Sequence, residues 1–552
     1  MSGPQWLVLF CSPDRGGQRC SAAVLPRLFH GLAGLAWLIS VITGRGQTLP
    51  TASADALLEG QLLARAHCTT CHLFPAPDAL DLATWRDQIL PRMKYRLGFS
   101  TAELEKSTNI ALLREHRRIP LTPVITEAQW LKLAGYYLAH APAEPLLPTN
   151  RPPIAVGLPG FKVRPLPFRL TNAAITSVAV VAEGGALAAD ATRNLIFRLN
   201  RAGQPTTAVE LPGGVASWRR YDHRFLVTGI GSFLPTEQRL GSVQWLEAAP
   251  GGKLLLRPVF TGLPRTTDAL RADFNRDGLA DYVVSSFGNN LGQLVWHQGG
   301  TNGLGPAREL FGLAGTLRAE VRDFNGDGHT DVVALVAQET ESLLLFTNDT
   351  KGGFGKQVIY QRPPHWGHSH FEVADFNHDG RPDFLVSNGD NGEFSSPPKR
   401  VHGVRIFTAQ PDLTWKETFF FPQNGAYHAA AVDFDGDGDL DIASISYYVD
   451  YVRVPRESFV LLTNDGQGGF AASTFAESAT GRWVAMDTGD FDADGDPDIL
   501  LGAYISGPTA VPKKLFDAWQ QMERPLLLLE NQRIAAGAKP SAGPTPTPPP
   551  AP

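Results

Sequence analysis

The chain has 552 residues, of which 43% are hydrophobic and 19% are charged, so it is long enough to hold more than one soluble globular domain. Its formal net charge at pH 7 is -6, which gives no basic footprint for a nucleic acid. We therefore expect no nucleic-acid partner.

An apolar run near the N-terminus predicts export. Arg27 precedes residues 28–43, and this run has the length of a signal-peptide core rather than of a full membrane span. We interpret residues 1–47 as a signal peptide or as an N-terminal anchor that keeps the protein at a membrane. Either interpretation places the mature protein in the periplasm, outside the cell or at the cell surface.

The run Cys68-Thr69-Thr70-Cys71-His72 has the CxxCH pattern of covalent haem attachment. Two residues between the cysteines let both sulfurs reach one porphyrin, and the adjacent imidazole then lies beneath the iron. The pattern predicts one haem c, held by Cys68 and Cys71, with His72 as an axial ligand.

Paired cysteines also occur in redox disulfides and in zinc sites, so these are the alternatives. The chain has four cysteines, and the other two, Cys11 and Cys20, precede the apolar run. No second CxxC is present to complete a zinc cage, which leaves a disulfide or free thiols as the alternative to haem.

Residues 48–145 have the pattern of a small helical haem domain. An amphipathic helix over 55–67 leads into the CxxCH run, and Thr126 and Gln129 form a capping box before a helix over 130–138. Two helices that bracket a haem resemble a class I cytochrome c, and this resemblance implies a sixth iron ligand. Met93 is the only methionine of this domain and is the predicted ligand, which would favour electron transfer. Because only 21 residues separate it from His72, the substitutes are His67, His116 and His140.

A proline-rich stretch at 146–160 reads as a semi-rigid linker. After it, a D-x-[DN]-x-D-G-x-x-D motif occurs five times, starting at residues 273, 323, 375, 433 and 490. The spacing of 50 to 58 residues is typical of propeller blades. Each motif lies between two β-rich runs, which predicts a turn between two strands.

A later apolar strand recurs in each repeat, and it also occurs twice upstream without the motif, at 194–198 and 242–246. Five complete and two degenerate units predict a seven-bladed β-propeller over 161–535, a closed ring without open sheet edges. The fold class is therefore a small all-α cytochrome c-like domain followed by an all-β propeller. Residues 536–552 are predicted to be a disordered proline-rich tail.

The motif supplies hard oxygen ligands on a tight loop, which is the chemistry of calcium binding. An EF-hand is excluded, because its position 12 needs a bidentate Glu between helices and here lies in a strand. The motifs resemble the FG-GAP or VCBS repeats of integrin-α-like propellers, which implies up to five calcium ions that staple the blades. The implied ligands are Asp273, Asn275, Asp277, Asp281, Asp323, Asn325, Asp327, Asp331, Asp375, Asn377, Asp379, Asp383, Asp433, Asp435, Asp437, Asp441, Asp490, Asp492, Asp494 and Asp498.

The same geometry predicts a funnel opposite the calcium loops. The residue five positions before each motif is expected to line it, which gives Asp268, Arg318, His370, His428 and Ala485. His368 and Trp483, two residues earlier, and the polar or aromatic residues after the second strands join this group: Asn388, Asp390, Tyr447, Tyr448 and Tyr504. Histidines at strand starts are also common packing residues, so His370, His428, Asp268 and Arg318 are catalytic candidates only.

Three functions are compatible with these features. The favoured one is an exported monohaem electron-transfer protein whose propeller docks a redox partner protein. The second is a periplasmic oxidoreductase that oxidises a small polar substrate in the funnel and passes electrons to the haem. The third is a cell-surface binding or adhesion module, with a polysaccharide as a candidate ligand. No hydrolase or nucleotide-binding motif is present.

Overall fold

The computed structural model describes residues 9–11, 20–22, 53–100, 105, 110–391, 397–507 and 509–533. The chain divides into two units, Met1–Ser53 and Ala54–Pro552. In the first unit, β1 (Leu9–Cys11) pairs antiparallel with β2 (Cys20–Ala22). The predicted signal or anchor run and the predicted tail lie outside the described residues. None of the described helices is both long and apolar enough to cross a membrane.

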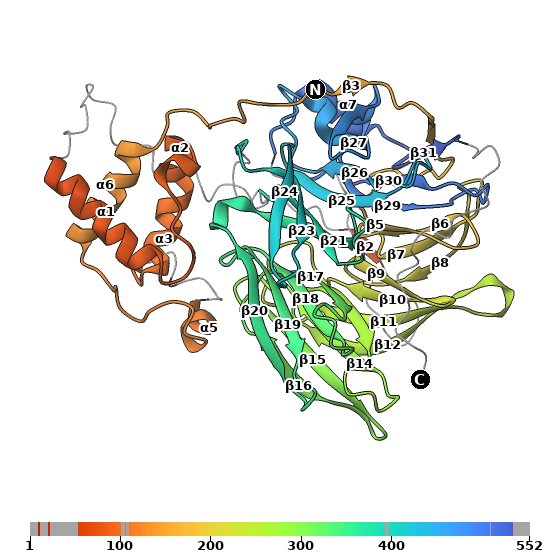
Figure 1. The fold of residues 1–552 in the computed structure, drawn as a ribbon, viewed down its shortest axis with the longest axis horizontal. Helices are drawn as coiled ribbons and strands as arrows, with labels where there is room; N and C mark the ends of the chain where they lie inside the picture. The colour runs from red at the N-terminus through yellow and green to blue at the C-terminus, as the bar shows by residue number, and fades with distance from the viewer. Residues whose placement is uncertain are drawn as a thin grey trace. The chain divides into compact units, whose positions relative to one another are not determined.

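The second unit begins with a helical segment (Figure 1). Its elements are α1 (Ala54–Cys68), η1 (Pro77–Ala79), α2 (Leu82–Thr84), η2 (Trp85–Ile89), α3 (Leu90–Arg96), α5 (Ile110–Glu115) and α6 (Glu127–His140). The predicted capping box opens α6, because Thr126 Oγ1 accepts a hydrogen bond from Gln129 N and the Gln129 side chain accepts one from Thr126 N. Both predicted helices are therefore confirmed.

Helices α1 and α6 pack closely where Gly60 of α1 meets α6. A Cβ atom on Gly60 would lie 2.2 Å from the Lys132 carbonyl oxygen, a distance that no side chain tolerates. Around this crossing, Trp85, Trp130, Leu133 and Tyr137 form a buried apolar core. The core is what holds these short helices together, since isolated helices of this length are marginal in water.

We predict that Gly60→Ala destabilises the helical segment by about 1–3 kcal/mol, because the added methyl group forces the two helices apart. Gly135→Ala on α6 is the matched control. Nothing lies within 4 Å of a Cβ there, so that change should stabilise the helix by about 0.5–1 kcal/mol. Urea denaturation followed by far-UV circular dichroism measures both. Equal effects of the two variants would contradict a close crossing at Gly60.

The rest of the unit is a seven-bladed β-propeller of antiparallel sheets. Blades 1 to 3 contain β5 (Ile175–Val180), β6 (Ala186–Asp190), β7 (Leu195–Leu199), β8 (Pro205–Glu210); β9 (Val215–Tyr221), β10 (Arg224–Gly229), β11 (Gly241–Ala248), β12 (Leu254–Leu263); and β13 (Thr266–Ala272), β14 (Asp281–Ser286), β15 (Gln293–Gly300), β16 (Gly303–Phe311). Blades 4 and 5 contain β17 (Thr316–Arg322), β18 (Asp331–Val336), β19 (Ser342–Asn348), β20 (Phe354–Gln361); and β21 (His368–Ala374), β22 (Asp383–Asn388), β23 (Gly403–Ala409), β24 (Trp415–Pro422). Blades 6 and 7 contain β25 (Ala426–Val432), β26 (Asp441–Ser446), β27 (Phe459–Asn464), β28 (Phe470–Thr474); and β29 (Trp483–Gly489), β30 (Asp498–Ala503), β31 (Leu526–Asn531).

The predicted seven-bladed architecture is confirmed, with blades 1 and 2 as the two units that lack the acidic motif. The first strand of each blade contacts the first strands of both neighbouring blades, and β29 contacts β5, so these inner strands form a closed ring. Apolar clusters fill the space between neighbouring blades, as between blades 3 and 4. Helix α7 (Lys513–Gln520) lies in the connection between β30 and β31.

The ring is closed by a strand that precedes blade 1 in the sequence. β4 (Phe161–Pro165) pairs antiparallel with β31 and completes blade 7. One feature differs from the sequence prediction: β3 (Ala155–Val156), inside the predicted linker, pairs parallel with β28 of blade 6. Part of the linker backbone is therefore hydrogen-bonded to the edge strand of blade 6.

Candidate functional site

The CxxCH run begins at the last residue of α1. Thr69 Oγ1 donates to Arg65 O and Thr70 Oγ1 donates to His67 O, so both threonines satisfy carbonyl groups at the helix end. His72 Nδ1 lies 2.9 Å from Leu73 O. A carbonyl oxygen only accepts, so Nδ1 carries the proton and the Nε2 lone pair is free to bind a metal ion.

The two cysteines are in different environments. Cys71 is exposed, whereas Cys68 packs against the apolar core of the helical segment, with its sulfur 4.0 Å from Tyr137 Oη. Burial raises the pKa of the Cys68 thiol to about 11, which disfavours the thiolate. A redox disulfide needs a reactive thiolate, so this environment fits a cysteine that packs against a bound group better than a thiol that exchanges.

Met93 is on α3 and packs in the same apolar cluster as Cys68. The substitutes are placed differently. His116 and His140 are exposed, and His140 Nδ1 bonds to Tyr136 O of its own helix. His67 is partly buried and lies on α1, one residue before Cys68. Of these four residues, Met93 therefore has the surroundings that best fit a distal haem ligand.

Each of the five acidic motifs forms the loop between the first and second strands of its blade, as predicted. In every loop, the Asp at position 1 accepts a hydrogen bond from the backbone N–H of the Gly at position 6. These glycines have φ between 79° and 105°, a left-handed conformation that a residue with a Cβ adopts at a cost. The loop is thus folded around its acidic side chains.

The Asp at position 9 has a second role that the sequence did not reveal. One of its carboxylate oxygens accepts from the backbone N–H at position 2 of its own loop, and the other accepts from a backbone N–H that lies further along its blade. All five are at most 1% exposed: Asp281, Asp331, Asp383, Asp441 and Asp498. These residues therefore hold the loop to the blade, and Asp441 and Asp498 also belong to clusters of carboxylates within their loops.

The loops of blades 6 and 7 bring together oxygen ligands of the kind that calcium prefers. In blade 6, Asp433, Asp435 and Asp441 bring carboxylate oxygens within 4.8 Å of one another, as do the matching residues of blade 7. In blade 7, Asp492 Oδ1 and Asp496 Oδ1 are buried without a hydrogen-bond partner among the described residues. Such a donor set fits a hard divalent cation.

Calcium is predicted to stabilise the propeller more at pH 8 than at pH 5. Burial raises the pKa of Asp441 to about 6 and that of Asp498 to about 7, whereas an unfolded Asp has a pKa of about 3.9. Without calcium, Asp441 and Asp498 therefore contribute their full stabilisation of the fold below pH ~4. This contribution is lost as the pH rises to about 7. Calcium offsets this loss by neutralising the carboxylates. Melting temperatures with calcium and with chelator at both pH values measure the difference, and an equal calcium effect at pH 5 would contradict it.

The inner strands share a register shift that orients the predicted funnel residues. All seven first strands have one unpaired residue at this point. In blades 3 to 7, it immediately precedes the residue that we expected to line the funnel. Such bulges redirect the side chain that follows them. Asp268, Arg318, His370 and His428 are thus at equivalent positions on β13, β17, β21 and β25, which surround the propeller axis.

The structure brings these four residues into two groups. On one side, Arg219 Nη2 lies 2.5 Å from Asp268 Oδ2 and Arg219 Nη1 lies 2.6 Å from Glu320 Oε1, while Arg318 also contacts Glu320. On the other side, the rings of His370 and His428 are 3.8 Å apart between their centroids. Arg219 and Glu320 were missed by the sequence prediction, although each lies two residues beyond an equivalent funnel position, on the same face of its strand.

The other predicted funnel residues are packing residues. His368 is 1% exposed, with Nδ1 2.9 Å from Glu341 Oε2 and Nε2 3.1 Å from Tyr360 Oη. Trp483 and Ala485 are buried in apolar clusters between blades. Asn388 donates to two backbone carbonyls, and Tyr447, Tyr448 and Tyr504 pack against neighbouring aromatic rings. Asp390 contacts Tyr448 at the same end of the blades.

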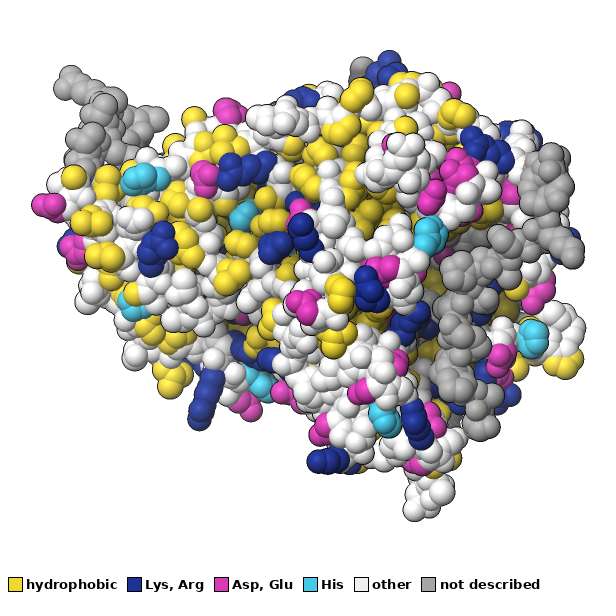
Figure 2. All heavy atoms as spheres, in the orientation of Figure 1, with side chains coloured by type: hydrophobic (Ala, Val, Ile, Leu, Met, Phe, Trp, Pro, Cys, Tyr) yellow, Lys and Arg dark blue, Asp and Glu magenta, His cyan; other side chains and the backbone are white. Residues whose placement is uncertain are grey.

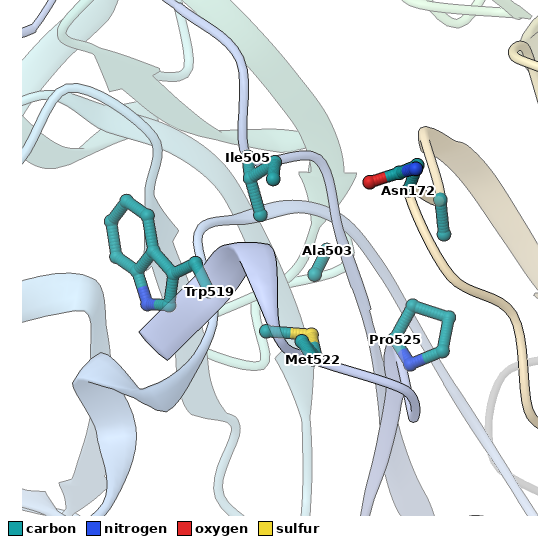
Figure 3. Close-up of a pocket in the computed structure, with 7 residues that line it drawn as sticks. Asn172, Ala503, Ile505, Trp519, Met522 and Pro525 are labelled. Atoms are coloured by element: carbon teal, nitrogen blue, oxygen red, sulfur yellow. The ribbon is translucent and has the colours of Figure 1, made fainter. Parts of the chain in front are cut away.

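A small pocket lies beside α7, lined by Asn172, Ala503, Ile505, Trp519, Met522 and Pro525 (Figure 3). Its volume is about 10 Å³, which is the space of about one water molecule. This pocket is therefore too small for an organic substrate.

Residues 273–334 and 323–386 match the model of the FG-GAP-like repeat. These two stretches are FG-GAP-like repeats. They contain the acidic loops of blades 3 to 5 and the second strands of blades 3 and 4, and they end within β22 of blade 5. No curated protein matches the chain.

Among solved structures, several match the chain at low identity. The N-terminal domain of Nup159 is 11% identical, covering 69% of this chain and 98% of that chain, with a TM-score of 0.39. The Dos1 propeller is 8% identical (65% and 78% covered, TM-score 0.39). Virginiamycin B lyase from Staphylococcus aureus is 12% identical (67% and 98% covered, TM-score 0.40). These likenesses are too distant to carry an argument about function.

Proposed function

We propose that this protein is an exported monohaem c-type electron-transfer protein whose calcium-stabilised propeller docks a redox partner protein. The observation that carries the proposal is the common packing of Cys68 and Met93 in one apolar cluster beside the CxxCH turn. The FG-GAP-like propeller is compatible with docking or binding. Export would place the protein in the periplasm or at the cell surface, where haem attachment and calcium loading take place.

Four residues would hold the haem. Cys68 and Cys71 would form the thioether bonds, and His72 Nε2 and the Met93 sulfur would bind the iron. The haem supplies one-electron chemistry when it is bound. The chain's own contribution is to orient His72 through the Leu73 carbonyl and to keep water from the group with the apolar core around Trp85 and Tyr137.

The surface of the helical segment supports a docking role. Hydrophobic side chains are exposed there (Figure 2), and they include Leu58, Leu62, Leu73, Leu121, Val124 and Leu131, each at least 40% exposed. Leu73 directly follows the proposed axial ligand. Redox encounters use small interfaces, below about 1,200 Å² of buried surface, and exposed apolar groups near the cofactor suit such brief contacts.

Calcium would be held by the five acidic loops, through the side chains named in the sequence analysis. Its role would be to neutralise carboxylates that crowd each loop and to fix the loops between the inner strands and their neighbours. As extracellular modules, such loops would bind calcium with a dissociation constant of about 10⁻⁴–10⁻³ M.

An optical experiment tests the haem assignment. In protein produced with haem-attachment machinery, the reduced spectrum should be low-spin and unchanged by carbon monoxide, because Met93 and His72 fill both axial positions. Met93→Ala should bind carbon monoxide readily. Met522→Ala, a partly buried methionine of the propeller, is the control and should behave as the unaltered protein. Carbon monoxide binding to the unaltered protein would contradict Met93 ligation.

The second candidate function is a periplasmic oxidoreductase with its substrate site at the propeller axis. The adjacent His370 and His428 favour it, because they lie among charged groups that could orient a small polar substrate. Haem reduction driven by sugars or alcohols, lost in His370→Gln and His428→Gln, would support this function. Electron exchange with partner proteins that is unchanged in both variants would support the electron carrier.

A further inference from the structure

We propose that His370, Glu372 and His428 bind one divalent first-row transition-metal ion, with Zn²⁺ as the probe, at the axis of the propeller. The site is distinct from the acidic calcium loops and from the CxxCH run. It requires neither of them to be loaded.

Three side chains from two neighbouring blades converge at this site. His370 and Glu372 are two residues apart on β21, so both side chains project from the same face of the strand. His428 is on β25, the inner strand of the next blade, and its ring contacts that of His370. One ligand atom from each residue lies within 4.8 Å of the other two. Nitrogen and oxygen ligands around one tetrahedral zinc ion lie about 3.3–3.6 Å apart, so small side-chain rotations would close the site.

The hydrogen bonding leaves ligand atoms of His370 and Glu372 available. Neither ring nitrogen of His370 makes a hydrogen bond of normal geometry with the described residues, although both are buried. A buried polar atom without a partner is unfavourable, so packing alone does not explain two such atoms in one ring. Glu372 uses one carboxylate oxygen to accept from Ala431 N, which fixes the side chain and leaves the other oxygen available.

The chemistry of the ligands selects the kind of metal. Two imidazole nitrogens and one carboxylate suit zinc or iron, whereas calcium prefers oxygen ligands alone. The nearby cations do not oppose a metal strongly, because Arg318 is paired with Glu320, and Arg219 is paired with Asp268 and Glu320. Three protein ligands leave at least one coordination position for water or a substrate, which is the pattern of catalytic rather than structural zinc sites.

Zinc titration calorimetry tests the proposal on the full chain with all four cysteines replaced, so that thiols contribute nothing: Cys11→Ala, Cys20→Ala, Cys68→Ala and Cys71→Ala. Calcium in the millimolar range keeps the acidic loops occupied. We expect one zinc ion per chain. His370→Gln and His428→Gln should each weaken binding by more than about 100-fold, because loss of an outer-shell partner alone costs about 10- to 100-fold.

Asp487→Asn is the matched control. Asp487 is an inner-strand carboxylate that accepts from Val180 N of the neighbouring blade, as Glu372 does from Ala431 N, but it lies outside the three ligands. Its zinc affinity should be unchanged. An anomalous difference map of unaltered protein crystallised with zinc locates the ion even where a variant fails to fold. A map without a peak between His370 and His428, or zinc affinity retained in both histidine variants, would overturn the proposal and assign the pair to water-mediated packing.

Discussion

Asp331→Ala is expected to destabilise the propeller by about 2–6 kcal/mol in chelator, and by at least as much in calcium, where the loop also loses a proposed ligand. Asp331 is fully buried, and its two carboxylate oxygens accept from Phe324 N at 3.1 Å and from Asn348 N at 2.8 Å. Alanine leaves both N–H groups buried without an acceptor, and each costs about 1–3 kcal/mol. Urea unfolding monitored by tryptophan fluorescence measures the loss.

Asp327→Ala separates this structural effect from calcium binding. Asp327 is an exposed position of the same loop, so in chelator its replacement should change stability by about 0.5 kcal/mol or less. In calcium, Asp327→Ala should lose the part of the stabilisation that its loop provides. If the two variants were equally destabilised in chelator, the buried carboxylate would not hold the loop to the blade as we describe.

Cys68→Ala combined with Cys71→Ala is expected to abolish covalent haem completely. Without either sulfur, haem would be held only by axial ligands and would be lost on denaturation. Haem staining after denaturing electrophoresis and the mass of the intact chain both measure attachment.

The other two cysteines provide the control. Cys11→Ala with Cys20→Ala should retain full staining, because both residues precede the predicted export segment. Unaltered protein that carries no haem, although produced with attachment machinery, would contradict the proposed function. The protein would then be a binding propeller whose CxxC pair has a role other than haem attachment.

Much of the propeller could be predicted from local sequence. The acidic motif marks the first loop of blades 3 to 7, because its carboxylates and its glycine are needed at fixed positions of one turn. Blades 1 and 2 were found from their third strands alone. The pairing of β4 with β31 was not predictable in this way, since it joins residues more than 350 positions apart and no local pattern encodes the partner.

The funnel was predicted only in part. Counting from the motif located Asp268, Arg318, His370 and His428, because the distance from the loop to the bulge is constant. It misassigned His368 and Trp483, which precede the bulge and therefore face the space between blades. It missed Glu372. This residue shares a strand face with His370, but its proximity to His428 depends on how two neighbouring blades pack, which the spacing of the motifs does not show.

The position of β4 has a mechanical consequence. The strand that completes blade 7 directly follows β3 and the connection from the helical segment, so the ring is closed by the part of the chain nearest to that segment. A pull on the helical segment would load the short β3 and β28 pairing first and the β4 and β31 pairing next, before it reached the inner ring. Cleavage between Pro165 and Ile175 would separate β4 from the other three strands of blade 7, so that only non-covalent contacts would hold it there. The intact backbone between β4 and β5 therefore keeps the ring closed.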